Sequence, residues 1–189
     1  MAVLEVIKYG DPILRQQTKD VDDISKDKYK ILIDDMFETM YDEKGVGLAA
    51  NQVNIGLNIL VLDITRIIES LEEENIAYEE KDIGKKIFFN TKIIATEGSC
   101  IMEEGCLSIP EIRASIKRPD IITIQFYGID GKRYEEKFSG FISRVLQHEI
   151  DHLNGKYFTD YLSPSKRTLI QKKLMEISKK GYPSTGIVL

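Results

Sequence analysis

The chain has 189 residues, and with 42% hydrophobic and 30% charged residues it has the composition of a folded globular protein. Such a composition excludes disordered and collagen-like chains. Because 26 Lys and Arg stand against 31 Asp and Glu, the net charge is −5 and the molecule as a whole repels phosphate backbones. We therefore expect no direct DNA binding.

The sequence also limits where the protein works. No stretch approaches the roughly 18 apolar residues of a membrane span, and the N-terminus lacks the apolar core of a signal peptide. Two cysteines, Cys100 and Cys106, are too few for a disulfide framework. No repeat or flexible linker divides the chain. We expect a cytoplasmic protein without membrane contact that forms a single domain over residues 1–189.

Hydrophobic periodicity predicts the secondary structure in chain order. Apolar residues at helical spacing predict helices over Ser25–Tyr41, over 143–154, and from Ser163 or Pro164 to about Lys180. Strands are predicted at 58–64, 86–90 and 120–127, the last continuing through a turn at 128–131 into a second arm at 132–138. Short strands followed by helices predict an α+β fold.

Two segments carry no predicted chemistry. The acidic stretch between Arg66 and Asp82 is typical of a solvated helix or a surface insertion. The tail from Gly186 to Leu189 either pairs with a sheet edge or hangs free.

Both histidines of the chain lie in one H-E-x-x-H pattern, His148-Glu149-Ile150-Asp151-His152. Residues four apart on a helix project from one face, so both imidazoles can bind the same cation with Glu149 beside them. Apolar neighbours on both sides favour a buried helix over two solvated histidines. The pattern therefore predicts a metal site.

A catalytic metal usually has three protein ligands and one open position, so a third ligand is needed. The metzincin pattern would place it at Phe158, which cannot bind a metal. A thermolysin-like scheme would use Glu176, which lies in a strongly basic segment. The preferred candidate is Cys106, because Gly105 before it lets the backbone pass close to a bound group and a thiolate is a soft ligand.

A third unusual segment is Gly45-Val-Gly-Leu-Ala-Ala-Asn-Gln52. Its small side chains suit a place where a substrate backbone approaches closely, and Gln52 offers an amide N–H donor. The segment lacks the features of a dinucleotide loop or a phosphate loop.

Together these segments resemble the three signature motifs of peptide deformylase, which here are Gly45–Gln52, Glu104–Ser108 and Gln147–His152, in the order of the family. Two further segments, Tyr9–Arg15 and Tyr161–Pro164, are similar to the family's N-terminal segment and to the start of its C-terminal helix.

This chain departs from the family's pattern at two positions. Asn51 stands where many members have proline, and Arg144 stands where some relatives carry an apolar side chain.

The resemblance implies small mixed and antiparallel sheets around a central metal-binding helix, with a C-terminal helix. It implies an enzyme that removes the N-formyl group from the N-terminal methionine of newly synthesised polypeptides and releases formate. The implied ligands of one divalent ion are Cys106, His148 and His152. The thiolate and imidazole set suits zinc or iron. The family implies Fe(II), with Zn, Ni or Co able to take its place.

The resemblance also implies the roles of further residues. Glu149 would accept a proton from the attacking water and pass it to the departing amine. The Gln52 side-chain amide and the Leu107 backbone N–H would stabilise the oxyanion. The nascent peptide would add as an extended strand along Val46, Gly47 and Gly105, with its methionine in an apolar pocket near Val46.

Several alternatives stay open at the level of sequence. The basic C-terminal segment either docks on the ribosome, as in related enzymes, or is a solvated helix face. Asp151 either orients the metal site or caps local hydrogen bonds. A zinc endopeptidase with Glu176 as ligand, and a structural metal site with a closed shell of four ligands in a binding module, are the competing functions.

Overall fold

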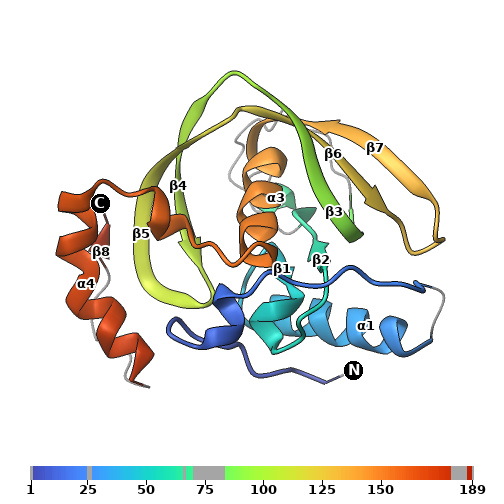
Figure 1. Ribbon diagram of the computed structural model, residues 1–189, viewed down its shortest axis with the longest axis horizontal. Helices are drawn as coiled ribbons and strands as arrows, with labels where there is room; N and C mark the ends of the chain where they lie inside the picture. Colours follow the sequence, from blue (N-terminus) through green and yellow to red (C-terminus); the bar gives the residue numbers. More distant parts are fainter. Residues whose placement is uncertain (1, 25–26, 66, 70–83, 180–186, 189) are drawn as a thin grey trace.

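The computed structural model describes residues 2–24, 27–65, 67–69, 84–179 and 187–188 (Figure 1). Its helices are η1 (Pro12–Arg15), α1 (Asp27–Asp42), η2 (Ala50–Val53), α3 (Gly140–Leu153), η3 (Phe158–Tyr161) and α4 (Pro164–Ser178), where η marks a 3-10 helix. Its strands are β1 (Gly47–Ala49), β2 (Ile59–Leu62), β3 (Lys86–Glu97), β4 (Cys100–Cys106), β5 (Ile109–Arg118), β6 (Ile121–Tyr127), β7 (Arg133–Phe138) and β8 (Ile187–Val188).

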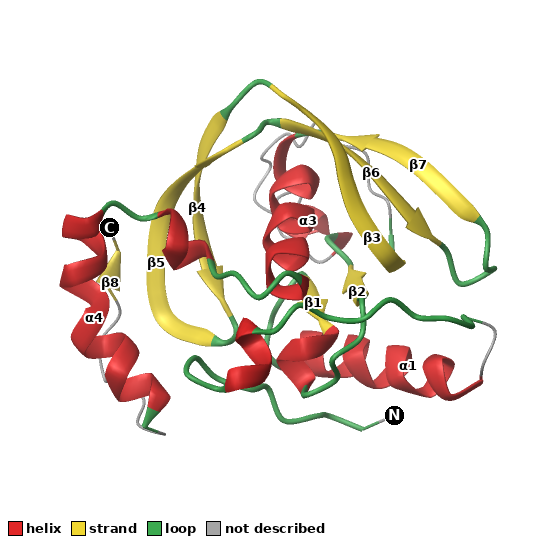
Figure 2. Cartoon of the chain, viewed as in Figure 1, coloured by secondary structure: helices red, strands yellow, loops and turns green. Residues whose placement is uncertain are grey.

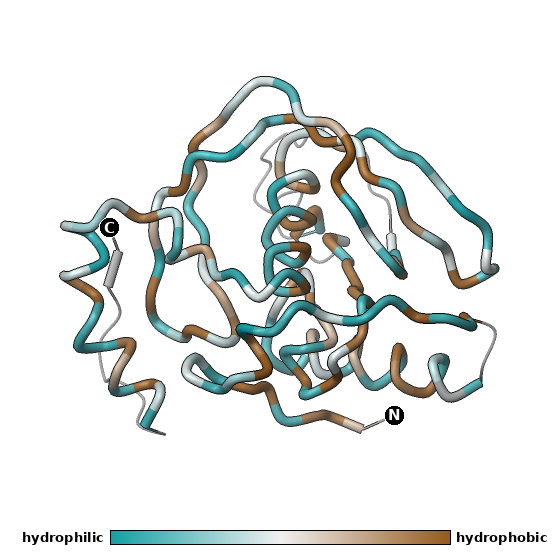
Figure 3. The backbone as a smooth tube through the Cα atoms, viewed as in Figure 1, coloured by the Kyte–Doolittle hydropathy of each residue, from teal (hydrophilic) through white to brown (hydrophobic). Residues whose placement is uncertain are grey.

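Five strands form an antiparallel sheet in the order β1-β2-β3-β6-β7. Strand β2 is buried along its whole length, and Figure 3 shows it as a hydrophobic segment inside the molecule. This continuous apolar run is expected for a strand covered on both faces. The hairpin of β6 and β7 was predicted from sequence and is confirmed, with Tyr127 opposite Arg133.

The second sheet has the order β4-β5-β8. Strands β4 and β5 form an antiparallel hairpin in which Cys106 lies opposite Ile109, so that Leu107 and Ser108 are the two residues of its turn. Strand β8 pairs with β5 in parallel orientation. The two described residues of the C-terminal tail, Ile187 and Val188, therefore pair with a sheet edge, and this sheet is mixed.

Helix α3 lies at the centre, between the β4–β5 hairpin and strands β3, β6 and β7 (Figures 1 and 2). Its apolar residues Leu146, Ile150 and Leu153 belong to the same core as Leu60 and Phe88 of the five-stranded sheet. Burying one such side chain stabilises the fold by about 1.5–3 kcal/mol. The core thus holds the helix that carries both histidines.

The end of α3 depends on Gly155. Its φ is +70°, a conformation that side chains rarely adopt, and a Cβ there would lie 2.5 Å from the carbonyl oxygen of Arg15. The chain can therefore leave the helix and pass close to η1 only with glycine at this position.

The outer helices cover the remaining apolar faces. Residues of α1, including Met36 and Met40, share a core with Ile59 and Val61 of β2. Ser163 caps the N-terminus of helix α4, because its hydroxyl accepts the Lys166 N–H at 3.4 Å. Pro164 is the first residue of the helix. Its Ile170, Leu174 and Ile177 pack in a core with Ile112 and Ile116 of β5.

The predicted α+β class, with mixed and antiparallel sheets around a central helix and a C-terminal helix, is confirmed. The strand predicted at 86–90 continues to Glu97, and β1, β4 and β5 were not predicted. Most of the acidic stretch at 66–82 lies outside the described residues. Within the described part of the chain, no helix is long and apolar enough to cross a membrane.

Candidate metal centre

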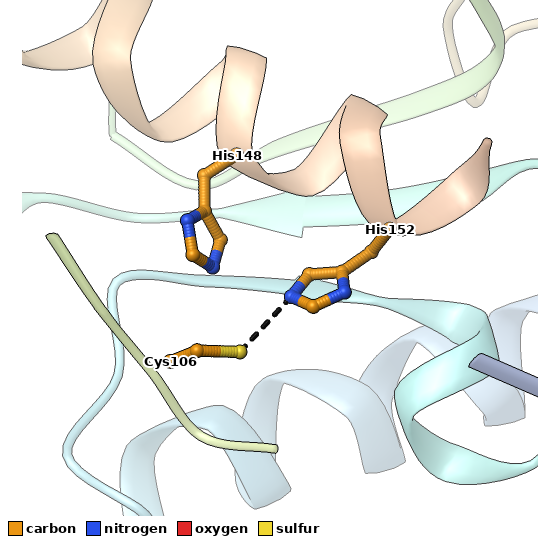
Figure 4. Close-up of side chains that lie close together, drawn as sticks. All are labelled: Cys106, His148 and His152. Carbon is orange, nitrogen blue, oxygen red and sulfur yellow. Dashed lines mark hydrogen bonds between the residues drawn. The ribbon is translucent and has the colours of Figure 1, made fainter. Parts of the chain in front are cut away.

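Helix α3 and the end of β4 bring three candidate ligands together (Figure 4). The Cys106 sulfur and one ring nitrogen each of His148 and His152 lie within 4.8 Å of one another. The Cys106 Sγ lies 3.0 Å from the Nε2 of His152. Two metal–ligand bonds of about 2.0–2.3 Å at a tetrahedral angle span about 3.5 Å, so these two atoms lie near enough to share one ion. One thiolate and two imidazoles are donors that suit a divalent transition metal, so these residues fit such an ion.

The electrostatics of the cluster favour the thiolate. Burial raises the pKa of the Cys106 thiol, but the charges and hydrogen bonds of His152 and His148 lower it more, and the net pKa lies well below that of an ordinary thiol. The thiolate is the form of cysteine that binds metals. The thiolate is therefore the form of Cys106 that its neighbours stabilise.

A buried carboxylate orients one of the two imidazoles. The Nδ1 of His148 lies 3.0 Å from the Oε2 of Glu104 on β4. A carboxylate at Nδ1 makes that nitrogen the protonated one, which leaves Nε2 with its lone pair for a metal. Burial raises the pKa of Glu104, but hydrogen bonds from His148 and Arg118 lower it well below its ordinary range.

Two arginines hold Glu104 in turn. Arg118, at the end of β5, donates to both carboxylate oxygens, from Nε at 2.7 Å and from Nη2 at 3.0 Å. Arg144 of α3 donates to the Oε1 from its Nη1 at 2.8 Å. The same Arg118 donates to the Oδ2 of Asp151 at 2.6 Å. Asp151 is therefore joined through Arg118 and Glu104 to His148, and its carboxylate belongs to the network that orients the site.

Sequence reasoning did not single out Arg118, and it named Glu104 only as part of a motif. A signal was present, because Ile112, Ala114 and Ile116 alternate with exposed residues and place Arg118 on the buried face of β5. A buried arginine requires a carboxylate partner. Arg144, which also lines the cleft, donates to Glu104.

Glu149 lies beside the cluster in a closed environment. It is 5% exposed, and its Oε2 has no hydrogen-bond partner among the residues that the structure describes. Burial raises the pKa of this carboxyl above its ordinary value. A Cβ at Gly47 would lie 2.7 Å from the Oε1 of Glu149, so only glycine lets the β1 backbone pass here. The carboxylate can therefore accept a hydrogen bond or a proton from a group that enters the site.

The amide of Gln52 has a defined orientation. Its Oε1 accepts the Ala49 N–H at 2.9 Å, so its Nε2 faces the other way and donates to the hydroxyl of Ser108 at 3.2 Å. The same Nε2 lies 3.7 Å from the Cys106 sulfur. The Gln52 amide N–H and the Leu107 turn are consequently next to the cluster.

These residues open onto a cleft of about 640 Å³. Its lining includes the sequence-predicted residues Val46, Gly47, Gln52, Gly105, Cys106, Leu107, His148 and Glu149. His152 is 1% exposed and lies behind this lining. Glu176, the alternative ligand, lies on α4 and is not part of the cluster.

Comparison with known proteins agrees with the motifs. Residues 3–168 match the family described as polypeptide deformylase. The peptide deformylase of Syntrophobacter fumaroxidans is 42% identical over 173 residues, covering 92% of this chain and 94% of that protein. That of Buchnera aphidicola subsp. Acyrthosiphon pisum is 44% identical over 181 residues, with 96% of each chain covered.

Solved structures give the same result. A peptide deformylase from Ehrlichia chaffeensis superimposes with a TM-score of 0.82 at 35% identity, covering 95% of this chain and 98% of that one. The peptide deformylase from Thermus thermophilus gives a TM-score of 0.81 at 30% identity, with 95% and 99% covered. On its motifs, its fold and these relatives, the chain belongs to the polypeptide deformylase family of hydrolases.

Proposed function

We propose that this chain hydrolyses the formyl amide at the N-terminal methionine of newly synthesised polypeptides and releases formate. The proposal is supported by one arrangement above all: a cluster of Cys106, His148 and His152 next to the cleft, with the unpartnered carboxylate oxygen of Glu149 beside it, among the residues that the structure describes. The relatives named peptide deformylase support the substrate class.

In this proposal Cys106, His148 and His152 hold one divalent cation. Fe(II) is the metal that the family resemblance implies, and Zn, Ni or Co suit the same donors. When bound, the cation would lower the pKa of a water molecule and polarise the formyl carbonyl. Glu104 keeps the His148 ring in the orientation that the cation requires.

Glu149 moves the proton. Its buried carboxylate takes the proton of the attacking water as the water oxygen adds to the formyl carbon. It then gives that proton to the amide nitrogen as the carbon–nitrogen bond breaks, so the products are formate and a free methionine amine. The raised pKa of Glu149 suits both steps, because a group that first accepts a proton and then returns it works best when its pKa lies near the working pH.

The Gln52 amide N–H and the Leu107 backbone N–H donate to the oxygen that gains negative charge. Donors that the fold already holds in place stabilise this charge better than water does. Losing one such donor raises the activation free energy by about 3–4 kcal/mol. The Ala49 N–H supports this role of Gln52, because it holds the amide oxygen away from the cluster.

The substrate would lie as an extended strand along the cleft, beside Val46, Gly47 and Gly105. The carbonyl of Val46 already accepts the Asp63 N–H at 3.0 Å, so its N–H is the group that we assign to the substrate. The apolar side chains of Phe141 and Val145 line the cleft near α3 and suit a methionine side chain.

We assign residues 1–189 to one catalytic domain. We also assign the protein to the cytoplasm, because its proposed substrate emerges during translation.

Helix α4 carries Lys166 and Arg167 and exposes Leu169 and Met175. A partly basic, partly apolar face of this kind would fit ribosome docking, whereas loss of α4 without effect on ribosome cosedimentation would exclude it.

The decisive experiment measures formate release from a formyl-methionyl peptide by protein purified without oxygen, with metal analysis of the same sample. Wild type should release formate and carry about one divalent ion per chain. Glu149→Gln should keep the ion and lose most of the activity. If Glu149→Gln keeps the ion and wild type releases no formate, the site is a structural one and the proposal is wrong.

A further inference from the structure

The N-terminal segment Ile7–Tyr9 ties together the two pieces of chain that carry Gln52 and Leu107. The backbone N–H of Ile7 donates to the carbonyl of Gln52 at 2.7 Å, and that of Tyr9 donates to the carbonyl of Ser108 at 2.8 Å. Between them, the Nζ of Lys8 donates to the carbonyl of Leu107 at 3.0 Å. Figure 2 shows this segment as a loop that leads into η1.

The turn at Leu107 and Ser108 needs such support. In a two-residue hairpin the ladder ends at the flanking pair, here Cys106 and Ile109, and the turn carbonyls have no partner in the sheet. The sheet alone therefore leaves the tilt of the turn weakly defined. Here both turn carbonyls are held from outside, one of them by a cation that is 99 residues away in sequence.

Lys8 also pairs with a carboxylate that lines the same cleft. Its Nζ lies 3.7 Å from the Oε1 of Glu43, which follows α1 and precedes the glycine-rich segment. The Lys8 side chain is 22% exposed and lines the cleft. Its ammonium therefore contacts both the carbonyl of Leu107 and the carboxylate of Glu43.

We propose that Lys8 is a positioning residue for the oxyanion site, acting through the carbonyl of Leu107 on the N–H of the same residue. This inference rests on the proposed function, in which that N–H meets the oxyanion. A charged donor makes a stronger hydrogen bond than a neutral one. The other two hydrogen bonds to the turn, from the Tyr9 N–H and from the Gln52 amide, both end on Ser108, so Lys8 is the donor that holds the Leu107 carbonyl. Without the ammonium the turn can tilt, and the Leu107 N–H then no longer points at the position of the oxyanion.

The expected effect falls on kcat rather than KM. The Leu107 donor matters when charge develops on the oxygen, so its misplacement weakens the transition state more than the bound substrate. Complete loss of an oxyanion donor lowers kcat about 100-fold to 1,000-fold. A tilted donor keeps part of this stabilisation, and we expect a loss of about 10-fold in Lys8→Met.

Lys8→Met is the suitable variant because it keeps an unbranched apolar stem and leaves the backbone bonds of Ile7 and Tyr9 in place. Lys8→Arg restores a charged donor, and Glu43→Gln removes only the ion pair with Lys8. For each variant we would measure kcat, KM, metal content and melting temperature. Hydrogen–deuterium exchange over residues 103–110 reports the turn without any catalysis.

If the inference holds, Lys8→Met lowers kcat about 10-fold with KM within about 2-fold and equal metal content, and amide exchange around Leu107 becomes faster. Lys8→Arg recovers most of kcat, and Glu43→Gln changes kcat by less than about 2-fold. These expectations follow from the contact with Leu107 and not from the contact with Glu43.

Unchanged kcat and exchange in Lys8→Met, alongside an active wild type, would overturn the inference and leave the proposed function intact. A loss of metal or a fall in melting temperature that accounts for the lost activity would also overturn it, as would a Glu43→Gln variant that behaves like Lys8→Met. A wild type that binds metal but releases no formate would instead remove the proposed function on which the inference rests.

Discussion

The Oε2 of Glu104 lies 3.0 Å from the Nδ1 of His148, so a buried carboxylate from β4 fixes the orientation of an imidazole on α3. Glu104 is in turn bound by Arg118 and Arg144, and all three side chains are nearly fully buried. The sheet and the helix thus meet at the metal site through charge as well as through apolar packing. The metal affinity of the site should therefore depend on Glu104.

Glu104→Gln should lower the affinity for the metal about 10-fold to 100-fold, because the amide neither accepts from two arginines nor holds the His148 tautomer as strongly. Competition with a chelator measures the change. The matched control is Glu103→Gln, since Glu103 is the exposed neighbour that pairs with Arg113 at 3.3 Å on the surface. Equal metal affinity in the two variants would contradict the role of Glu104.

The second prediction concerns the identity of the sulfur ligand. Cys106→Ser should lose most of the bound metal, because a hydroxyl is a much weaker ligand than a thiolate. Cys100→Ser should keep its metal, since Cys100 lies at the far end of β4 and contacts Arg144. Glu176→Gln should also keep it. Metal loss in Glu176→Gln with retention in Cys106→Ser would favour the endopeptidase ligand set.

The third prediction uses the close approach of β1 to α3. In Gly47→Ala the new Cβ would lie 2.7 Å from the Oε1 of Glu149 and 2.8 Å from a methyl carbon of Val145, so the carboxylate must move. A shift of about 1 Å in a catalytic group can cost about 100-fold in rate, so we expect a loss of that order in kcat with the metal retained.

Gly56→Ala is the control for this substitution, because a Cβ at Gly56 meets nothing within 4 Å. It should keep full activity and stabilise the fold by about 0.4–1 kcal/mol through the unfolded chain. Formate release and thermal unfolding of both variants test the pair. Full activity in Gly47→Ala would show that the Glu149 position tolerates the extra methyl group.

The pairing of the two histidines could be predicted from sequence because its information is local, whereas Cys106 lies on β4 and was favoured by its residue type and by the family resemblance. His148 and His152 share one helix face, and the helix has a clear apolar period. The Glu104 network could not be predicted in the same way, because it joins β4, β5 and α3. Strand β4 carries a buried Glu104 where a core strand would have an apolar residue, and this breaks the pattern by which strands are recognised.

The outer half of β3 and the contacts of the N-terminal segment could not be predicted from sequence either. Beyond residue 90, most of β3 is exposed, including Ile93 and Ile94, and the strand is held by pairing with β6 rather than by burial. Hydrophobic periodicity therefore ends before the strand does. The ties of Ile7 and Tyr9 to Gln52 and Ser108 use backbone groups, which have no side-chain signal at all.

The last prediction is a dependence of stability on pH at Asp160, the residue at which η1, η3 and α4 meet. Its carboxylate accepts from Arg15 at 2.6 and 3.0 Å, from the Tyr157 N–H at 2.9 Å and from Arg167 at 3.2 Å. Burial raises the pKa of Asp160, but Arg15, the Tyr157 N–H and Arg167 lower it more, so the net pKa is below its ordinary value.

A carboxyl whose pKa is lower in the folded state than in the unfolded chain stabilises the fold above the unfolded pKa of about 3.9, and this contribution is lost as the pH falls through the folded pKa. Asp160→Asn should therefore lower the free energy of unfolding at pH 7 by about 1 kcal/mol, a value reduced by the partial exposure of the Arg15 pair. Below about pH 4 the difference from wild type should shrink.

Urea unfolding from about pH 7 to about pH 3.5 measures this difference, and metal release at low pH acts on wild type and variant alike, so it does not alter the comparison. Asp34→Asn, at an exposed position of α1, should change stability by less than about 0.5 kcal/mol at every pH. A cost of Asp160→Asn that stays constant across this pH range would mean that the side chain acts by shape and neutral hydrogen bonds, and that its charge contributes nothing.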